Sequence, residues 1–563
     1  MSAHEPATAV TDRLEELRAA LTSLELGLAL PGADGARGAR DELVAQIGDY
    51  LLPRLRQMDA PLLMVVGGST GAGKSTLVNS LVGTVVSPAG VLRPTTRAPV
   101  LATNPDDVRW FEGDRILPAL PRTTGGVAGP GGLQIVETPS LPTGLALLDS
   151  PDIDSVLSEN RELARQLLAA ADAWLFVTTA ARYADAVPWE YLRAAHDRGT
   201  ALSIVLNRVP PDAEQEVRAH LRSMLDEQDL EGAELLVVPE TRLERELLPV
   251  AALAPVREWL DSLAADAQAR AALVRRTLEG ALASLPGRVG AVEMAAEDQL
   301  KAAAELRSDV EHAYVAALDE VDTSLRNGSL LRGEVLARWH EVVGTGDLMR
   351  ALESRVGWLR DRLRTAITGK PPAQAELQEA VESGVESVVR AAADRAAEST
   401  AQSWRGHPAG RKLLDDHPRL DVVSPDFAAA AEREIRAWQA SVFELVREEG
   451  AEKRTTARFA SLGVNGAGLV VMLAVFAHTG GLTGAEIVVA GGTSALSQKV
   501  LEAIFGDQAV RALAAKARDD LLERVEGLLE HEAARFTALL EPVSPTQASL
   551  TRVREALAPL ARA

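Results

Sequence analysis

The residues best suited to chemistry lie between Gly68 and Ser75, where Gly-Ser-Thr-Gly-Ala-Gly-Lys-Ser matches the phosphate-binding pattern G-x-x-x-x-G-K-S/T at every constrained position. Glycines in such a loop let backbone N–H groups point at phosphate oxygens. Lys74 can place a positive charge on the β- and γ-phosphates, and the Ser75 hydroxyl can bind Mg²⁺. We therefore expect a nucleotide to contact Gly68, Ser69, Thr70, Gly71, Ala72, Gly73, Lys74, Ser75 and Thr76.

Two further segments are typical of the same kind of site. The apolar run from Gly144 to Leu148 ends in Asp149, whose carboxylate can bind Mg²⁺ directly or through water. Between the glycine loop and this run, Arg93-Pro94-Thr95-Thr96-Arg97 lies where a threonine closes over Mg²⁺ and the γ-phosphate in switch loops, and we favour Thr96 over Thr95. The predicted metal ligands are therefore Ser75, Thr96 and Asp149.

The elements that must position these residues form an alternating pattern. The glycine loop follows the apolar run Leu62 to Val66 and precedes Thr76 to Val82, which can form a helix. From there to about Leu248, short apolar runs alternate with amphipathic segments, as in a parallel α/β sheet. The Pro- and Gly-rich segment Pro118 to Gly132 is expected to be a loop. The expected strands are Leu62–Val66, Val108–Phe111, Leu133–Glu137, Leu145–Leu148, Ala173–Val177, Ala201–Leu206 and Leu235–Val238.

Helices are expected on both sides of this α/β region. Before it, a series of leucines at steps of three and four predicts one helix, and about Asp41 to Met58 predicts a second. After Pro255 the strand pattern stops, and apolar residues recur at helical spacing over Leu306–Leu325, Ile435–Leu445 and Val510–Leu528, as in a helical bundle. The first series consists of Leu14, Leu17, Leu21, Leu24 and Leu28.

A second informative stretch, residues 459–496, interrupts the helical half. Phe459 to Ala477 is almost wholly apolar, and about 18 to 20 such residues can cross a bilayer. A turn and a shorter apolar run, Leu482 to Leu496, complete a hydrophobic hairpin, and flanking Lys and Arg residues favour both ends on the cytoplasmic face. The alternative is a hairpin buried in a soluble helical core. The expected membrane residues are Leu469, Val470, Val471, Leu473, Val475, Phe476, Ile487, Val488 and Val489.

Composition narrows the possible functions. A chain of 563 residues exceeds one ordinary core, so about two or three structural units are expected. The formal net charge of −21 argues against nucleic acid as a partner. The absence of cysteine excludes disulfides and thiolate metal sites. The acidic N-terminus does not resemble a signal peptide, so we expect most of the chain in the cytoplasm.

In these motifs and in the order of its parts, the chain resembles the translation-factor-like GTPases and, among them, the bacterial dynamin-like proteins. The resemblance implies an α/β P-loop GTPase domain, a mostly parallel sheet with helices on both faces, joined to a long all-α stalk. Residues 1–60 would be neck helices, 61–250 the GTPase domain, 251–458 the stalk, 459–496 a membrane hairpin at its tip, and 497–563 helices that return to the stalk.

Three positions depart from the family pattern. The family's Asp-x-x-Gly is Asp149-Ser150-Pro151-Asp152 here, which puts a second carboxylate near the phosphates. Its Asn/Thr-Lys-x-Asp is Asn207-Arg208-Val209-Pro210, and proline cannot supply the acceptor that selects guanine, although Asp212 can substitute for it. Thr70 stands where dynamins have a catalytic glutamine. The resemblance thus implies nucleotide contacts by Asp149, Asp152, Asn207 and Arg208, and catalytic roles for Lys74, Thr70 and Thr96.

The function favoured by these observations is a membrane-associated GTPase that hydrolyses GTP slowly, with Mg²⁺, to drive self-assembly and membrane remodelling. The resemblance implies membrane lipids as partners, a homo-oligomer or a hetero-oligomer with a related GTPase, and the cytoplasmic face of the cell membrane as location. One alternative is a membrane-anchored scaffold in which the nucleotide is a slow switch. Another is an ATPase of a membrane system, which Pro210 leaves open, although Asp149 is followed by serine rather than a catalytic glutamate.

Overall fold

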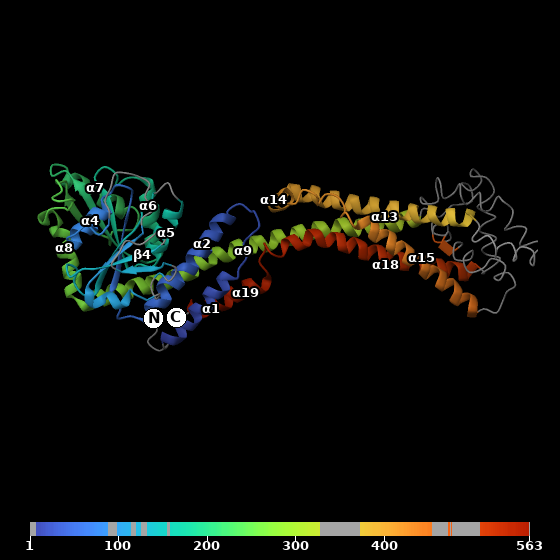
Figure 1. Cartoon of the computed structure of the whole chain (residues 1–563), viewed down its shortest axis with the longest axis horizontal. Helices are drawn as coiled ribbons and strands as arrows, with labels where there is room; N and C mark the ends of the chain where they lie inside the picture. The colour runs from blue at the N-terminus through green and yellow to red at the C-terminus, as the bar shows by residue number, and fades with distance from the viewer. Residues whose placement is uncertain are drawn as a thin grey trace, which may run out of the picture. The chain divides into compact units, whose positions relative to one another are not determined.

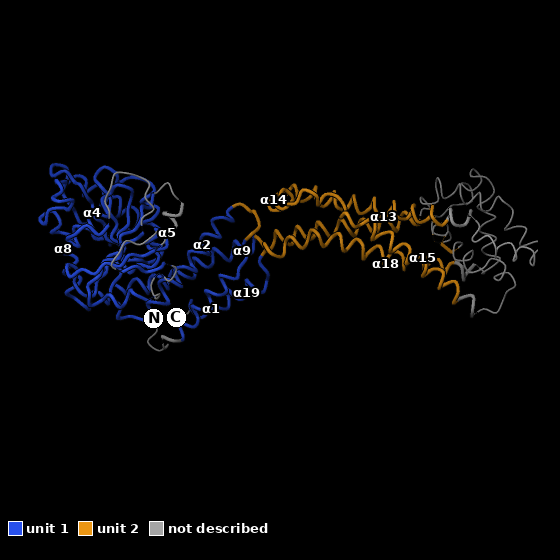
Figure 2. Tube along the Cα trace, viewed as in Figure 1, with its two compact units in different colours: residues 1–26, 32–298, 545–563 blue, residues 27–31, 299–544 orange. Residues whose placement is uncertain are grey.

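Figure 1 shows the computed structural model of the chain, which describes residues 7–87, 98–113, 117, 120–124, 132–154, 158–326, 372–452, 471, 472, 475 and 507–561. The chain divides into two compact units (Figure 2). Unit 1 comprises residues 1–26, 32–298 and 545–563, and unit 2 comprises residues 27–31 and 299–544. The predicted division into neck, GTPase domain, stalk, hairpin and returning helices stays a prediction.

Unit 1 is built on a mixed eight-stranded sheet. The strand order is β3-β4-β2-β5-β1-β6-β7-β8, and neighbouring strands run parallel except for the antiparallel pair β2 and β5. The parallel strands β5, β1, β6 and β7 therefore end at one edge, where α/β sheets bind ligands. The strands are β1 (Leu62–Gly68), β2 (Val100–Thr103), β3 (Arg122–Thr124), β4 (Leu133–Glu137), β5 (Leu145–Asp149), β6 (Ala173–Thr179), β7 (Ala201–Val209) and β8 (Glu234–Pro239).

Successive residues of the central strand β1 belong to two apolar cores, one on each face of the sheet. Leu63 and Val65 pack in a core with helices α5, α6 and α7. Leu62, Met64 and Val66 pack in another with α4, α8 and the first part of α9. A strand buried on both faces has an uninterrupted apolar sequence, which is why the pattern predicts it. These helices are α4 (Lys74–Val82), α5 (Ser158–Ala169), α6 (Ala186–Asp197), α7 (Glu214–Asp226), α8 (Val250–Ala265) and α9 (Ala267–Arg326).

Six of the seven expected strands are present, but the one expected at Val108–Phe111 is wrong. Val108 lies in the 3₁₀ helix η2 (Pro105–Trp110), because Pro105 starts the helix and the Asn104 side chain accepts a hydrogen bond from the Asp106 N–H. The sequence does not predict β2 or β3. The four residues of β2 follow a proline, and β3, Arg-Thr-Thr, has no apolar residue to reveal a strand inside the expected loop Pro118–Gly132.

Helices from both ends of the chain pack within unit 1. Helix α1 (Ala7–Thr22) contacts α19 (Gln547–Leu560). It also contacts three consecutive helical segments: α2 (Ala33–Gln46), the π-helix η1 (Ile47–Leu51) and α3 (Leu52–Arg56). Arg554 of α19 forms ion pairs with Glu293 and Glu297 of α9. The helical series around α2 begins before Asp41, where the sequence predicts its start.

The sequence predicts one helix over the leucine series at the N-terminus, and this prediction is wrong. Helix α1 ends at Thr22, so Leu24 and Leu28 lie beyond it. Leu24, Leu26 and Leu28 are all buried, and the residues between them are exposed. Burial at every second residue is typical of an extended segment, so the spacing of these leucines matched a helix only by coincidence.

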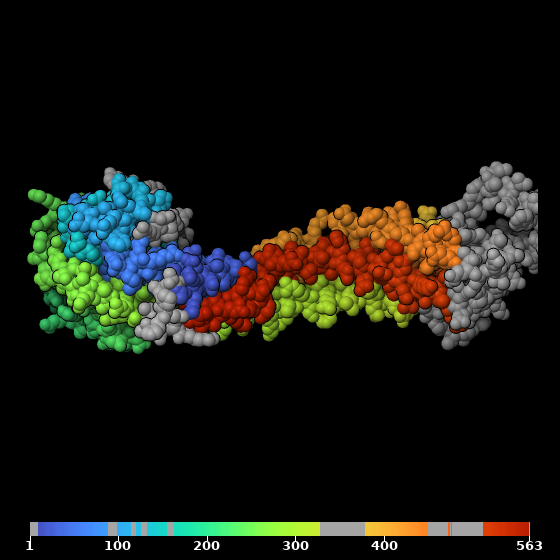
Figure 3. Space-filling view, turned by 90° about the horizontal axis from the view of Figure 1, so that it is seen from below, coloured from blue at the N-terminus to red at the C-terminus, as the bar shows by residue number. Residues whose placement is uncertain are grey.

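Unit 2 is a helical bundle with a continuous apolar core, as the sequence predicts. Two buried tryptophans join its helices: Nε1 of Trp404 donates to the Leu306 carbonyl oxygen at 3.1 Å, and Nε1 of Trp438 donates to the Ala517 carbonyl oxygen at 2.7 Å. On the face shown in Figure 3, red α18 lies between yellow-green α9 and the orange helices. Besides the end of α9, the bundle contains α13 (Pro372–Gly406), α14 (Pro408–Asp416), α15 (Phe427–Glu452) and α18 (Asp507–Leu540).

Most of the expected membrane hairpin lies outside the described residues, including Leu469, Val470, Leu473, Phe476, Ile487, Val488 and Val489. Val471, Met472 and Val475 are described as helical, and they are buried in the apolar core of unit 2. Apolar side chains of the bundle therefore cover Val471 and Val475, and the role of these two residues in a membrane stays a prediction. No helix within the described ranges is both long and apolar enough to span a bilayer.

Candidate nucleotide-binding site

The phosphate loop connects the carboxyl end of β1 to the amino end of α4 (Figure 1). Gly68 has a φ of +145°, and a Cβ at this position would lie 2.1 Å from the Val177 carbonyl oxygen in β6. Gly73 has a φ of +97°, and a Cβ there would lie 2.5 Å from Nδ2 of Asn207 in β7. Both positions therefore require glycine. These close approaches seat the loop against the ends of β6 and β7.

Lys74, in the first turn of α4, is only 5% exposed. Its ammonium donates to the carbonyl oxygens of Gly68 at 2.8 Å and Ser69 at 3.1 Å. It also donates to Oδ1 of Asp152 at 2.5 Å, so a predicted nucleotide-binding carboxylate forms an ion pair with it. The side chain therefore lies across the loop, with its charge at the carboxyl edge of the sheet.

Asp149 ends β5, in register with Val66 of β1, and its side chain is buried. Its Oδ2 accepts a hydrogen bond from the Ser87 hydroxyl at 2.7 Å. In the part of the chain that the structure describes, Oδ1 of Asp149 has no hydrogen-bond partner. Burial raises the pKa of this carboxyl above its ordinary value, and the hydroxyls of Ser87 and Ser75 and the charge of Lys74 oppose the increase.

Asp149 and Ser75 fit the requirements of a magnesium site. A buried carboxylate oxygen that has no donor in the described ranges, near the Ser75 hydroxyl, offers the oxygen ligands that Mg²⁺ prefers. No cluster of three or more His, Cys, Asp or Glu that could hold a metal occurs among the described residues. Because Mg²⁺ usually combines one or two protein ligands with phosphates and water, the pair suits an ion that binds together with a nucleotide. Thr95 and Thr96 lie outside the described residues.

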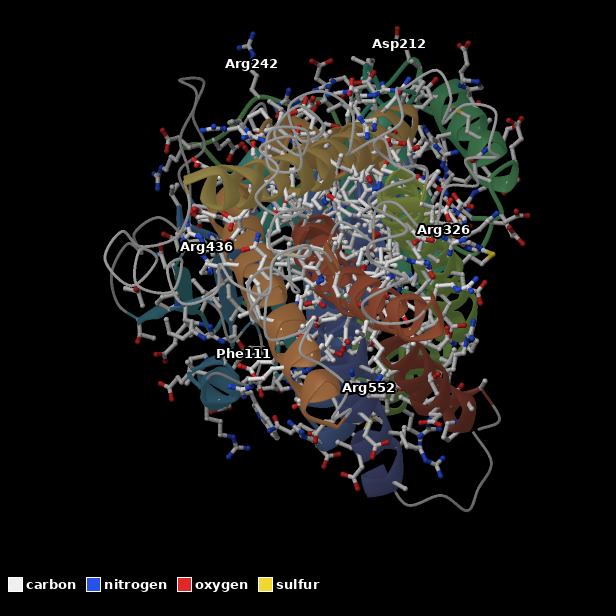
Figure 4. The ribbon with its side chains drawn as sticks, turned by 90° about the vertical axis from the view of Figure 1, so that its right-hand side faces the viewer. Phe111, Asp212, Arg242, Arg326, Arg436 and Arg552 are labelled. Carbon is white, nitrogen blue, oxygen red and sulfur yellow. The ribbon has the colours of Figure 1, made fainter. Side chains whose placement is uncertain are left out.

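Asn207, the first residue of the predicted base-recognition motif, is buried and supports the phosphate loop. Its Nδ2 donates to the Ala72 carbonyl oxygen at 2.9 Å, and its Oδ1 accepts from the Arg208 N–H at 2.9 Å. Arg208 has a φ of +54°, and the ladder between β7 and β8 is irregular at these two residues. The local irregularity turns the Asn207 side chain toward the loop. Asp212 lies in the following turn with its side chain exposed, and Figure 4 shows it pointing outward.

Two charged residues that the sequence analysis does not single out hold the backbone of Thr70. Oδ1 of Asp154 accepts a hydrogen bond from the Thr70 N–H at 2.6 Å, and Nη1 of Arg182 donates to the Thr70 carbonyl oxygen at 2.7 Å. Arg182 also donates to Oδ2 of Asp154 at 3.0 Å and to Asp185 at 2.8 Å. The only hint in the sequence is that these residues follow the runs that form β5 and β6.

Ser87 is a third residue that no motif predicts. Asn79 of α4 fixes its backbone: Oδ1 of Asn79 accepts from the Ser87 N–H at 2.8 Å, and Nδ2 donates to the Ser87 carbonyl oxygen at 2.6 Å. The Ser87 hydroxyl then reaches Asp149. The structure thus gathers the phosphate loop, Asp149, Asp152 and Asn207 at one edge of the sheet, and their roles toward a nucleotide stay predictions.

Comparison with known proteins gives matches only among solved structures. No family of related sequences and no curated protein matches the chain. A structure of an oligomerised bacterial dynamin pair is similar over 93% of this chain and 94% of its own, with 11% identity and a TM-score of 0.35. The bacterial dynamin GTPase LeoA from ETEC covers 98% of both chains with 14% identity and a TM-score of 0.23. Aquifex aeolicus Era with GDP and AlF₄⁻ covers 36% of this chain and 56% of its own, with 20% identity and a TM-score of 0.23. Bacterial dynamins are thus among the proteins to which the chain is similar, as its motifs predict.

Proposed function

We propose that this protein is a dynamin-like P-loop GTPase that binds GTP with Mg²⁺, hydrolyses it slowly, self-associates or pairs with a related GTPase, and acts at the cytoplasmic face of a membrane. Nucleotide binding is supported by three features that meet at one edge of the sheet. These are a glycine loop that tolerates no side chain at Gly68 or Gly73, the buried Lys74, and the buried Asp149, one oxygen of which has no partner among the described residues.

Each group has a distinct role in this proposal. Loop N–H groups and the Lys74 ammonium bind the phosphates and balance their charge. Ser75 and Asp149 hold Mg²⁺, which when bound supplies further charge neutralisation. Thr70 and Thr96 would position the attacking water and close the site. Asn207 keeps the loop in place through Ala72.

The residues after β7 decide whether the site selects guanine or adenine. Pro210 cannot accept hydrogen bonds from the guanine edge as a carboxylate does. The nearest carboxylate along the chain, Asp212, is exposed and points outward in Figure 4, so it can reach a base only if this turn moves. An adenine nucleotide is therefore the competing ligand, and the experiment must compare the two bases.

The proposed action at a membrane is supported by the apolar composition of residues 459–496. Because Val471, Met472 and Val475 belong to the core of unit 2, charges should be introduced elsewhere in this stretch, at Ile487 and Val489. We expect the full chain to pellet with vesicles that contain anionic lipid, and the double variant Ile487→Asp/Val489→Asp to remain in the supernatant. Equal pelleting of both proteins would contradict the membrane role.

Nucleotide binding and base preference are tested by equilibrium binding of GDP, GTP, ADP and ATP, with Mg²⁺, to the full chain and to Lys74→Ala. We expect guanine nucleotides to bind more tightly than adenine nucleotides, and Lys74→Ala to weaken binding of both guanine forms. Equal or tighter binding of adenine nucleotides would overturn the guanine assignment and favour an ATPase. No binding of any nucleotide would overturn the P-loop assignment itself.

A further inference from the structure

In its ion pair with Asp152, Lys74 donates the hydrogen bond that a nucleotide phosphate would need. An ammonium has three N–H donors, and the three hydrogen bonds that Lys74 forms with described residues go to the carbonyl oxygens of Gly68 and Ser69 and to Oδ1 of Asp152. The two carbonyls belong to the backbone of β1 and its loop, so they cannot leave without unfolding the loop. A phosphate oxygen that binds Lys74 must therefore replace Asp152.

The position of Asp152 is built into the fold. It lies between Asp149, whose carboxylate is held by Ser87, and Asp154, whose carboxylate is held by the Thr70 N–H. The neighbouring Ile153 is fully buried, and Pro151 restricts the backbone on the other side. The Asp152 side chain is itself 35% exposed, so it has room to move away while its backbone stays in place.

A second anion beside Lys74 affects diphosphates and triphosphates differently. A diphosphate contacts Lys74 through its β-phosphate alone and is otherwise bound by the N–H groups of the loop, whereas a triphosphate also brings its γ-phosphate to Lys74. The terminal phosphate of a triphosphate adds negative charge beside Lys74, where Asp152 already lies, and like charges that close repel each other. Either the carboxylate leaves, which breaks an ion pair to a lysine that is only 5% exposed, or the repulsion remains. Both outcomes weaken triphosphate binding more than diphosphate binding.

We propose that Asp152 is an internal competitor of the terminal phosphate, and that it makes this site prefer a nucleoside diphosphate over the corresponding triphosphate. The inference rests on the proposed nucleotide-binding function and adds its selectivity. Triphosphate binding then requires the Asp152 side chain to leave Lys74.

The test is to measure dissociation constants of GDP and GTP, with Mg²⁺, for the full chain and for Asp152→Asn and Asp152→Gly. Asn keeps the size of the side chain and removes its charge, and Gly removes both. We expect the ratio of the GTP constant to the GDP constant to fall roughly 10- to 100-fold in both variants, the range typical of one charge-assisted hydrogen bond. Most of this change should come from tighter GTP binding.

Glu216→Gln is the matched control, because it removes one negative charge from an exposed position of α7 in the same unit. It should leave the ratio within about twofold of the wild-type value, since an exposed charge is screened by solvent and salt. If both nucleotides bind and the ratio is unchanged in the two Asp152 variants, the selectivity proposal is overturned and the proposed function stands. If neither nucleotide binds to any of these proteins, both proposals fail.

Discussion

The phosphate loop should lose local stability when Asp154 is replaced by alanine. The Asp154 carboxylate accepts the Thr70 N–H at 2.6 Å and pairs with Arg182 at 3.0 Å, and Arg182 in turn donates to the Thr70 carbonyl oxygen at 2.7 Å. Asp154→Ala removes the acceptor of the Thr70 amide and one partner of Arg182. The change leaves the glycines of the loop and Lys74 in place, so it tests the support of the loop separately from its chemistry.

The expected loss follows from the nature of the two contacts. A hydrogen bond to a charged group contributes about 1.5–3 kcal/mol. Arg182 is 40% exposed, so its ion pair with Asp154 adds at most about 1 kcal/mol. Allowing for overlap, we expect the opening of the loop to become easier by about 2–3 kcal/mol, or about 30- to 150-fold in its equilibrium constant.

The pH sets the conditions of this experiment. Burial raises the pKa of Asp154, but the hydrogen bonds from Thr70 and the contacts with Arg182 outweigh it, so the pKa lies below the ordinary value of 3.8. A lowered pKa means that the contribution is complete above 3.8 and is lost as the pH falls through the folded-state pKa. At neutral pH the carboxylate is fully charged, and the full effect of the substitution is measured.

Amide hydrogen exchange of the full chain without nucleotide is the assay, because the Thr70 N–H is itself the donor that loses its acceptor. We expect this amide to exchange about 30- to 150-fold faster in Asp154→Ala than in wild type. Asp185→Ala is the matched control: Asp185 also pairs with Arg182, at 2.8 Å, whereas the hydrogen bonds of the Thr70 backbone within the described residues are with Asp154 and Arg182. Unchanged exchange in Asp154→Ala, or an equal increase in Asp185→Ala, would refute the support of the loop by Asp154.

Two further predictions concern buried charges in unit 1. Asp172→Ala should lower the free energy of unfolding of this unit by about 3–5 kcal/mol in urea denaturation, because it leaves the buried Arg54 guanidinium without its carboxylate. The double variant Arg54→Leu/Asp172→Leu should lower the free energy of unfolding much less than Asp172→Ala does. Equal losses of stability in the two variants would contradict this account. Asp149→Asn should be more stable than wild type at neutral pH, because burial raises the pKa of Asp149 above 3.8 and so penalises its charged form in the folded state. This advantage should shrink as the pH falls through the raised pKa and vanish below 3.8, and a difference that is independent of pH would contradict it.

Local patterns predicted the elements whose burial is regular. The β1 run is apolar throughout because both faces of the strand are covered, and the Leu306–Leu325 series follows one buried face of α9. The same reasoning failed where another local preference competed. Capping by Asn104 and Pro105 turned an apolar run into a 3₁₀ helix, and β3 at the edge of the sheet carries no apolar signal.

The amino-acid sequence by itself determined that a glycine loop with Lys74 and Ser75 lies between a strand and a helix, because every constrained residue of that motif is local in the chain. Only the tertiary structure decided what surrounds it. Lys74 meets Asp152 across 78 residues, and Asn207 meets Ala72 across 135. These meetings depend on the order β5-β1-β6-β7, which periodicity does not encode, since it reports burial along one segment and not which segment lies beside it. Asp152 stands where the Asp-x-x-Gly pattern has glycine, and the tertiary structure places its carboxylate against Lys74.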